Sequence, residues 1–329
     1  MSHLLEINNL DVKFDTDEGR ITAIDNVSLT LDQGKVLGIV GESGSGKSVT
    51  AKSIMQLNPG NTIYNDNAEI IIDDENVLKF TSKHDLKKIR GGKVSMIFQE
   101  PMASFAPAIK IGNQMVEQLM LHKPMDKKEA KNISIDMLNR VGIADAEKRF
   151  NQYAFELSGG MRQRAMIAMA LSTMPKLLLA DEPTTALDVT IQAQVINLMK
   201  DIIKEYNMGV IFITHDLGVI AQVADDVAVM YLGSVVEQGP VNEILKNPMH
   251  PYTKGLINAL PDINNLDAPL QPIPGNIPSP LDRPSGCVFR TRCPHASTDG
   301  KEGNIEMSLV EVKPGHWLDK CGVNCGKYE

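Results

Sequence analysis

The stretch GESGSGKS at residues 41–48 constrains the fold of this chain more than any other. It follows the apolar run 36–40, which predicts a buried strand, and precedes a segment from about Val49 that predicts a helix. Glycines let a backbone wrap closely around an anion, and the N–H groups at a helix start attract negative charge. A strand, a glycine loop and a helix in this order therefore predict a phosphate-binding loop. The alternative is a glycine-rich turn without a ligand.

The residue types of this loop predict the parts of a nucleotide that each would contact. Lys47 is expected to reach the β- and γ-phosphates of ATP, and Ser48 is expected to ligate Mg²⁺. Further contacts to the nucleotide are predicted for the other small residues of the loop and the first residue after it: Gly41, Ser43, Gly44, Ser45, Gly46 and Val49.

A second apolar run, at residues 176–180, ends in two acidic residues. This pattern fits a second strand at a phosphate site. Asp181 at its carboxyl end would hold Mg²⁺ through water, and Glu182 would point at the water that attacks the γ-phosphate. The pattern is common by itself, and the upstream phosphate-binding loop makes it specific.

The segment LSGGMRQR at residues 157–164 predicts another helix start, about twenty residues before Asp181. Ser158 is a natural N-cap, and the helix would continue through residue 170. Its two glycines leave the backbone N–H groups open to an anion, so the segment predicts a second anion-binding helix end. A plain serine-capped helix is the alternative.

With these three motifs in this order, the chain resembles the ATP-binding subunit of an ABC transporter. LSGGMRQR is similar to the signature motif of that family, so Ser158, Gly159 and Gly160 would bind the γ-phosphate of a nucleotide held by an opposing subunit. The resemblance implies an ATPase that works as a pair, with two ATP molecules held head to tail between two domains.

The same resemblance extends to further residues of the nucleotide site. Gln99, in the segment MIFQEP, matches a glutamine that senses Mg²⁺ and the attacking water, and Asp188 matches a residue that crosses the dimer interface. His215, in IFITHD, matches a histidine that holds the γ-phosphate and Glu182 in register. Phe14 is a candidate for stacking on adenine, against an ordinary strand phenylalanine, and residues 15–19 would be an insertion.

Four segments outside the ATPase motifs are similar to oligopeptide and dipeptide importer ATPases, of the D type. They are EPMASFAP at 100–107, HPYT at 250–253, IPGNIP at 273–278 and GCVFRTRCPHA at 286–296. This resemblance implies two transmembrane permease subunits, a homologous second ATPase subunit or a second copy of this chain, and an extracytoplasmic peptide-binding protein. It places the chain at the cytoplasmic face of the membrane as a peripheral subunit.

All four cysteines lie in the last 43 residues: Cys287, Cys293, Cys321 and Cys325. Such clustering in a reducing compartment favours a metal or cluster site over disulfides. Several members of the resembled branch carry a [4Fe–4S] cluster here, and four thiolates suit such a cluster or tetrahedral Zn²⁺. Unligated thiols and a disulfide are the other two interpretations. Gly300 stands where the branch usually has a third cysteine.

The pattern as a whole predicts an α/β P-loop NTPase core with a mainly parallel sheet. Alternation over residues 4–31 predicts an N-terminal antiparallel β subdomain, and residues 105–165 would form a helical subdomain. We expect an ABC nucleotide-binding domain at 1–260 and a C-terminal extension at 261–329. Residues 227–239 would form a hairpin, and 242–260 a helix interrupted by proline.

Composition limits the alternatives. A net charge of −8 argues against nucleic acid as a main partner, and no apolar run is long enough for a membrane span or a secretory signal. The rival functions are the ATPase of another ABC importer or exporter, such as one for nickel, and a soluble ABC ATPase of DNA repair or translation. A metal or redox sensor on an ATPase scaffold is the third. The transported substrate is not readable from these residues.

Overall fold

The computed structural model describes residues 3–100, 104–184, 189–260, 271–296 and 308–321. The chain forms two compact units. The first contains residues 1–4, 31–36 and 79–213, and the second contains residues 5–30, 37–78 and 214–329. The relations given below hold within each unit.

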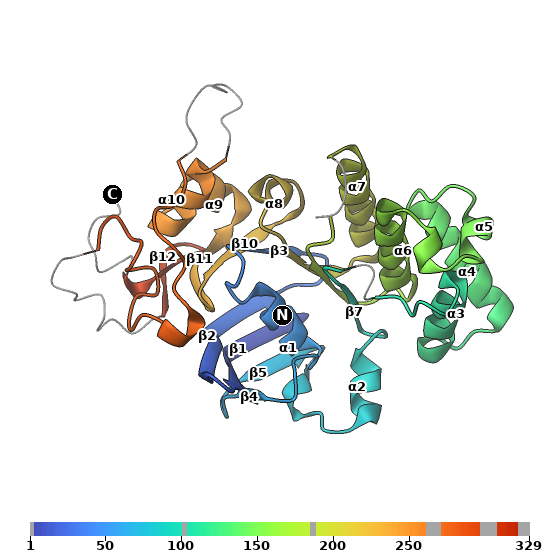
Figure 1. The fold of residues 1–329 in the computed structure, drawn as a ribbon, viewed down its shortest axis with the longest axis horizontal. Coiled ribbons are helices and arrows are strands. Elements are labelled where there is room, and N and C mark those ends of the chain that lie inside the picture. The colour runs from blue at the N-terminus through green and yellow to red at the C-terminus, as the bar shows by residue number, and fades with distance from the viewer. Residues whose placement is uncertain (1–2, 101–103, 185–188, 261–270, 297–307, 322–329) are drawn as a thin grey trace. The chain divides into compact units, whose positions relative to one another are not determined.

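An antiparallel sheet forms the N-terminal part of the second unit, as the alternating pattern predicted (Figure 1). Residues that face its core are fully buried and alternate with partly exposed ones, which is why the sequence shows a period of two. Its strands follow the order β2-β1-β5-β6, with β4 also paired to β1: β1 (Leu5–Thr16), β2 (Gly19–Leu31), β4 (Thr62–Tyr64), β5 (Glu69–Ile72) and β6 (Glu75–Asn76).

A second group of strands in this unit follows the order β12-β13-β11-β10-β3. β3 runs parallel to β10, whereas β10 and β11 form the antiparallel hairpin that the sequence predicted. The last two strands come from the C-terminal extension and were not predicted. The bounds are β3 (Val36–Val40), β10 (Asp226–Tyr231), β11 (Ser234–Pro240), β12 (Leu309–Lys313) and β13 (His316–Asp319).

Helices of the second unit pack closely on these strands. A Cβ atom added to Gly38 of β3 would lie 2.9 Å from Ile220 Cδ1 of α8, so only glycine permits this approach. Proline separates α9 from α10, as predicted. The helices are α1 (Lys47–Ile54), α8 (Leu217–Val223), α9 (Val241–Lys246) and α10 (Pro251–Asn258), with short 3₁₀ turns at η1 (Val77–Lys79) and η3 (Pro280–Asp282).

Three parallel strands form the core of the first unit, in the order β7-β8-β9. All of their residues are buried, which explains why these segments read as continuous apolar runs rather than as alternating ones. The elements are β7 (Val94–Ile97), β8 (Leu177–Asp181), β9 (Gly209–Ile213), α2 (Lys83–Ile89) and α7 (Val189–Tyr206).

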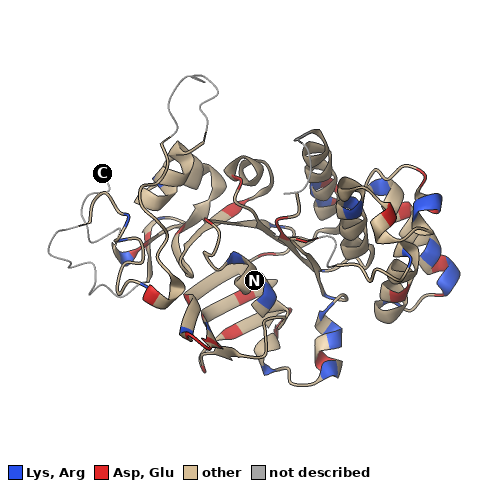
Figure 2. Ribbon diagram, viewed as in Figure 1, with Lys and Arg blue, Asp and Glu red and all other residues tan. Residues whose placement is uncertain are grey.

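The rest of the first unit is a group of helices that begin within the predicted helical segment 105–165, and the last of them runs seven residues beyond it (Figure 1). They are α3 (Ile111–His122), α4 (Lys127–Arg140), α5 (Ala146–Phe150), η2 (Ala154–Glu156) and α6 (Gly159–Ser172). Acidic and basic residues are interspersed over this group (Figure 2). No helix in the described part of the chain is long and apolar enough to cross a membrane. The α/β fold class, with its parallel core and antiparallel N-terminal sheet, is confirmed.

Candidate nucleotide site

The loop between β3 and α1 is closely packed against its own unit. Gly41 has φ +154°, and a Cβ atom there would lie 2.1 Å from the carbonyl oxygen of Met230. Gly46, the N-cap of α1, has φ +100°, and its Cβ atom would lie 2.7 Å from Ile24 Cδ1. Gly44, with φ +79°, faces open space at the exposed tip beside Ser43. Only glycine suits the positive φ and the close packing at Gly41 and Gly46, so these two residues fix the backbone of the loop against the rest of its unit.

Lys47 folds back into this loop rather than out to solvent. Its Nζ atom donates to the carbonyl oxygens of Gly41 at 2.7 Å and Glu42 at 2.9 Å, and to Ser45 Oγ at 3.3 Å. Lys47 is 6% exposed and Ser45 is 3% exposed. The ammonium group is therefore held at the inner face of the loop, where an anion enclosed by the loop would meet it.

Helix α1 begins at Lys47, two residues earlier than the sequence predicted. The reason is the left-handed conformation of Gly46, which turns the chain directly into the helix. Ser48 and Val49 therefore belong to the first turn, and both are half-buried. Their N–H groups are among those that a helix start leaves for a ligand.

In the first unit, the end of β8 brings two predicted catalytic residues together. Asp181 is the last residue of the strand and is buried, and Glu182 follows it. Gln99, just beyond β7, donates from Nε2 to Glu182 Oε2 at 3.2 Å. The pairing follows from the parallel register, because the carboxyl ends of adjacent parallel strands meet at one edge.

Glu182 has an unusual backbone conformation, with φ +48°. Its N–H group donates to the carbonyl oxygen of Ile213, the last residue of β9, at 2.9 Å. Non-glycine residues with positive φ are uncommon and cluster at functional sites, where the surrounding structure holds them in place. The bond to Ile213 therefore helps to hold Glu182 in this conformation at the end of β8.

Gln163 is a residue that the sequence reasoning did not assign. It lies on α6 within the quoted LSGGMRQR segment, is 1% exposed, and donates from Nε2 to the carbonyl oxygen of Pro183. This hydrogen bond therefore links α6 to Pro183, the residue directly after Glu182. The sequence shows a glutamine in the LSGGMRQR segment, but it shows neither that this side chain is buried nor that its partner lies twenty residues further along the chain.

The start of α6 is open, unlike the loop at α1. Ser158 is the N-cap and accepts a hydrogen bond at Oγ from Met161 N–H at 3.3 Å, as predicted. Ser158 and Gly159 are exposed, and a Cβ atom on Gly159 would meet no atom within 4 Å. Gly160 follows in the first turn and is half-buried. This helix tip is free to contact another molecule.

Two further candidates lie in the second unit. His215 is exposed and follows β9 by two residues, just before Asp216, which caps α8 by accepting from the N–H groups of Gly218 and Val219. Phe14 is half-buried on β1 opposite Thr62 of β4. The stretch that we expected to be an insertion is the end of the β1–β2 hairpin. Asp188 lies outside the described residues.

The cysteine segment brings two thiols into contact. Cys287 and Cys321 are both buried, and a hydrogen bond from Cys321 lowers the pKa of the Cys287 thiol, although burial acts in the opposite direction. Cys293 is partly exposed, and Cys325 lies outside the described residues. Among the residues that the structure describes, no three His, Cys, Asp or Glu side chains are grouped to hold a metal ion.

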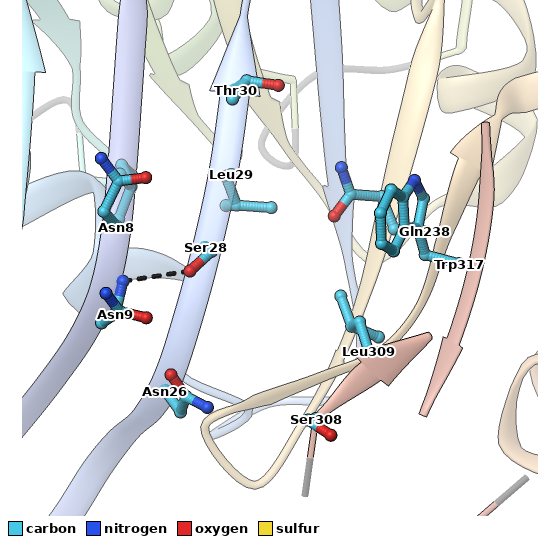
Figure 3. Close-up of a pocket in the computed structure, with 11 residues that line it drawn as sticks. Asn8, Asn9, Asn26, Ser28, Leu29, Thr30, Gln238, Ser308, Leu309 and Trp317 are labelled. Carbon is cyan, nitrogen blue, oxygen red and sulfur yellow. Dashed lines mark hydrogen bonds between the residues drawn. The ribbon is translucent and has the colours of Figure 1, made fainter. Parts of the chain in front are cut away.

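A pocket of about 400 Å³ with a mixed polar and apolar lining lies elsewhere on the second unit (Figure 3). It opens between β1 and β2 on one side and Gln238 and Trp317 on the other, with Asn9 N–H donating to Ser28 Oγ at 3.0 Å. Its lining, taken over the described residues, includes none of those predicted to bind nucleotide. The candidate nucleotide site is therefore identified from its residue types and the geometry of its loop, and it is separate from this pocket.

Comparison with known proteins now identifies the family. The family model described as ABC transporter matches residues 24–185, and the one described as oligopeptide/dipeptide transporter, C-terminal region, matches residues 236–299. The chain is 49% identical to oligopeptide transport ATP-binding protein AppD of Bacillus subtilis, over 100% of this chain and 98% of that protein. It is 48% identical to OppD of Salmonella typhimurium, over 89% and 87%.

A solved structure agrees with these matches. A bacterial ABC transporter cassette, solved as a dimer, is 27% identical with a TM-score of 0.65, and the match covers 72% of this chain and 98% of that one. The chain therefore belongs to the ABC transporter family of ATP-binding proteins, in the branch that carries the oligopeptide/dipeptide transporter C-terminal region.

Proposed function

We propose that this chain hydrolyses ATP and that hydrolysis powers the uptake of dipeptides or oligopeptides through a membrane permease. The loop at residues 41–48 carries the proposal, because its two packed glycines and inward-facing Lys47 form a cradle suited to a polyphosphate. Peptide as the substrate rests on the C-terminal family match and on the printed names of the relatives, which include the dipeptide transport protein DppD of Lactococcus lactis.

The residues divide the chemical work between them. Lys47 and the N–H groups at the start of α1 would bind the phosphates, and Glu182, positioned by Gln99, would orient the attacking water. His215 would hold the γ-phosphate, and Phe14 would stack on adenine. Hydroxyl, amide and carboxylate oxygens suit Mg²⁺, so Ser48, Gln99 and Asp181 would hold that ion, which supplies positive charge to the phosphates when bound.

The open tip at Ser158, Gly159 and Gly160 supports a partner arrangement in which it contacts the nucleotide of another subunit. A similar cassette, 26% identical with a TM-score of 0.65, was solved as a dimer bound to ADP and Pi. The proposed assembly contains a second, homologous ATPase subunit, or a second copy of this chain. Two permease subunits and an extracytoplasmic peptide-binding protein complete it, and the chain sits at the cytoplasmic face of the membrane.

The variant Glu182→Gln tests the hydrolytic role in the assembled complex. It should bind ATP as the native chain does but release phosphate about 100-fold more slowly, because the amide cannot act as a base. Glu117→Gln, an exposed change on α3, is the matched control and should hydrolyse ATP normally. Normal turnover by Glu182→Gln would remove this residue from the role given to it.

We also propose that the four cysteines hold a [4Fe–4S] cluster, with Zn²⁺ as the alternative. The contact between Cys287 and Cys321, and the lowered pKa of Cys287, support a site for thiolate ligands. Iron and acid-labile sulfide in the full chain, purified without oxygen, would support the cluster. Zinc alone would support the alternative, and the absence of both metals would refute the site.

A further inference from the structure

Three segments of the C-terminal region are linked, directly or through Arg292, to a single residue of the nucleotide loop. The HPYT, IPGNIP and GCVFRTRCPHA segments were noted in the sequence, and none of the residues given a role at the nucleotide site lies in them. In the second unit, HPYT and GCVFRTRCPHA contact Glu42, the second residue of the loop, and IPGNIP contacts Arg292, which in turn holds Glu42. Tyr252 lies 210 residues and Arg292 lies 250 residues after Glu42 in the chain.

Arg292 holds the side chain of Glu42. Its NH1 atom donates to Glu42 Oε2 at 2.7 Å and its NH2 atom donates to Oε1 at 3.3 Å, so the pair is bidentate. The side chain of Arg292 is 4% exposed, whereas that of Glu42 is 27% exposed. The guanidinium group is itself fixed, because its Nε atom donates to the carbonyl oxygen of Pro274 in the IPGNIP segment at 3.0 Å.

The backbone of Glu42 is held as well. Its N–H group donates to the hydroxyl oxygen of Tyr252 at 2.8 Å, and its carbonyl oxygen accepts from Lys47 Nζ at 2.9 Å. Tyr252 is fully buried and packs edge-on against Tyr231, with ring centroids 4.8 Å apart. Every polar group of Glu42 therefore has a partner. Two of these partners come from the C-terminal region, and the third is the lysine predicted to bind phosphate.

The charge of Glu42 gives its contact with Arg292 a bearing on phosphate binding. A carboxylate on a loop that encloses a polyphosphate repels it unless a cation compensates the charge. Arg292 supplies that cation from the side of the carboxylate remote from solvent, and a bidentate guanidinium also fixes the direction in which the carboxylate points. Without Arg292, the carboxylate would be free to turn towards the bound phosphates.

We infer that Arg292 is a positioning residue for nucleotide binding: it neutralises Glu42 and holds the loop in the shape that accepts phosphates. The inference rests on the proposed function and extends it, because it makes the C-terminal region part of the ATP site. The region's three recognisable segments then share one task, in which Arg292 and Tyr252 hold Glu42 and the IPGNIP carbonyl holds Arg292.

Titration calorimetry of the purified full chain with Mg-ATP tests this without a partner subunit. Arg292→Met should raise the dissociation constant for ATP about tenfold, a loss of about 1.4 kcal/mol. Glu42→Gln should bind ATP about twofold to threefold more tightly than the native chain, because the amide removes the negative charge while its oxygen still accepts from Arg292. The double variant should recover most of the affinity that Arg292→Met loses.

Two further variants are needed. One separates the charge of Arg292 from its bidentate geometry, and the other controls for the loss of an arginine from this segment. Arg292→Lys keeps the charge but loses the bidentate contact, so its affinity should lie between those of the native chain and Arg292→Met. Arg290→Met is the matched control, because Arg290 lies on the same segment and the described contacts of Glu42 do not include it. It should leave the dissociation constant unchanged.

The outcomes separate the inference from the proposed function. If the native chain does not bind ATP, the proposed function fails. If the native chain binds ATP and Arg292→Met binds it equally well, the inference fails. Equal weakness of Arg292→Met and the double variant would make Arg292 only a structural support, which also overturns the inference. Should Arg292→Met not fold, Glu42→Gln decides alone: weaker ATP binding by that variant contradicts the repulsion argument.

Discussion

Two helix starts in this protein carry glycines next to a predicted phosphate position, and they are built in opposite ways. At α1, Ser45 and Lys47 are buried, the lysine is turned inwards, and added Cβ atoms on Gly41 and Gly46 would collide with their own unit. At α6, Ser158 and Gly159 are exposed, and an added Cβ atom on Gly159 meets nothing. Gly41 and Gly46 are therefore required by the packing of this chain, whereas a larger residue would fit at Gly159.

This difference indicates how the two motifs would act. A closed loop is organised before its ligand arrives, so little ordering is needed when the ligand binds. The exposed helix tip at Ser158 and Gly159 is not packed against its own unit as the loop is, so it is available to a second molecule. Three substitutions test this contrast. Each is measured by the free energy of unfolding and by ATP binding or hydrolysis, and they run from the largest expected effect on stability to the smallest.

Gly41→Ala should destabilise the second unit by about 3 kcal/mol, because the new methyl group would collide with the Met230 carbonyl at a backbone angle that disfavours alanine. ATP binding should be lost along with the loop shape. Chemical denaturation and calorimetry with ATP provide the measurements. Gly44→Ala, at positive φ but in open space, is the control and should lose only about 1 kcal/mol. Equal losses for the two variants would contradict the closed-loop description.

Ser158→Ala should lower the free energy of unfolding by about 1 kcal/mol, because Met161 N–H loses its capping acceptor. Ser158→Asp keeps a good cap and so should retain stability, yet its carboxylate would repel a γ-phosphate from the partner subunit. We expect denaturation curves close to native for Ser158→Asp, together with a large loss of ATP hydrolysis in the complex. Normal hydrolysis by Ser158→Asp would mean that the serine only caps the helix.

Gly159→Ala should have the smallest effect on stability and a favourable one, of about 0.5 kcal/mol, because alanine is the better helix former. The methyl group has room in this chain but not where a phosphate is expected to contact the helix tip. ATP binding to the isolated chain should stay native, while hydrolysis by the complex falls roughly 100-fold. Native hydrolysis would show that the tip is not in contact with a nucleotide.

The parts of the fold that were predictable from sequence are those set by local pattern. Full burial on both faces makes β3, β8 and β9 continuous apolar runs, and the first strands alternate because one face is exposed. Motif spacing then located the loop, the acidic pair and the helix cap at Ser158, because each depends on neighbours within a few residues.

Other features depend on contacts between distant segments, and the sequence reasoning missed them. Nothing near Glu42 indicates that Arg292 will pair with it, since packing alone brings the two together. The positive φ of Glu182 depends on its bond to Ile213, and the partner of Gln163 depends on how α6 lies beside the chain after β8. Strands β12 and β13 are short and only partly apolar, so their pattern is too weak to read.

The hairpin of β12 and β13 has a consequence for any shortened form of this protein. β13 covers the outer edge of β11, and its His316 donates from Nε2 to the fully buried carboxylate of Glu237 at 2.8 Å. A chain cut at residue 260 would expose a bare strand edge ready to pair with other molecules, and would remove His316 from the Glu237 carboxylate, which also accepts from the N–H groups of Met249 and His250. The β12–β13 hairpin thus protects an edge of the sheet, and preparations of the shortened chain should aggregate.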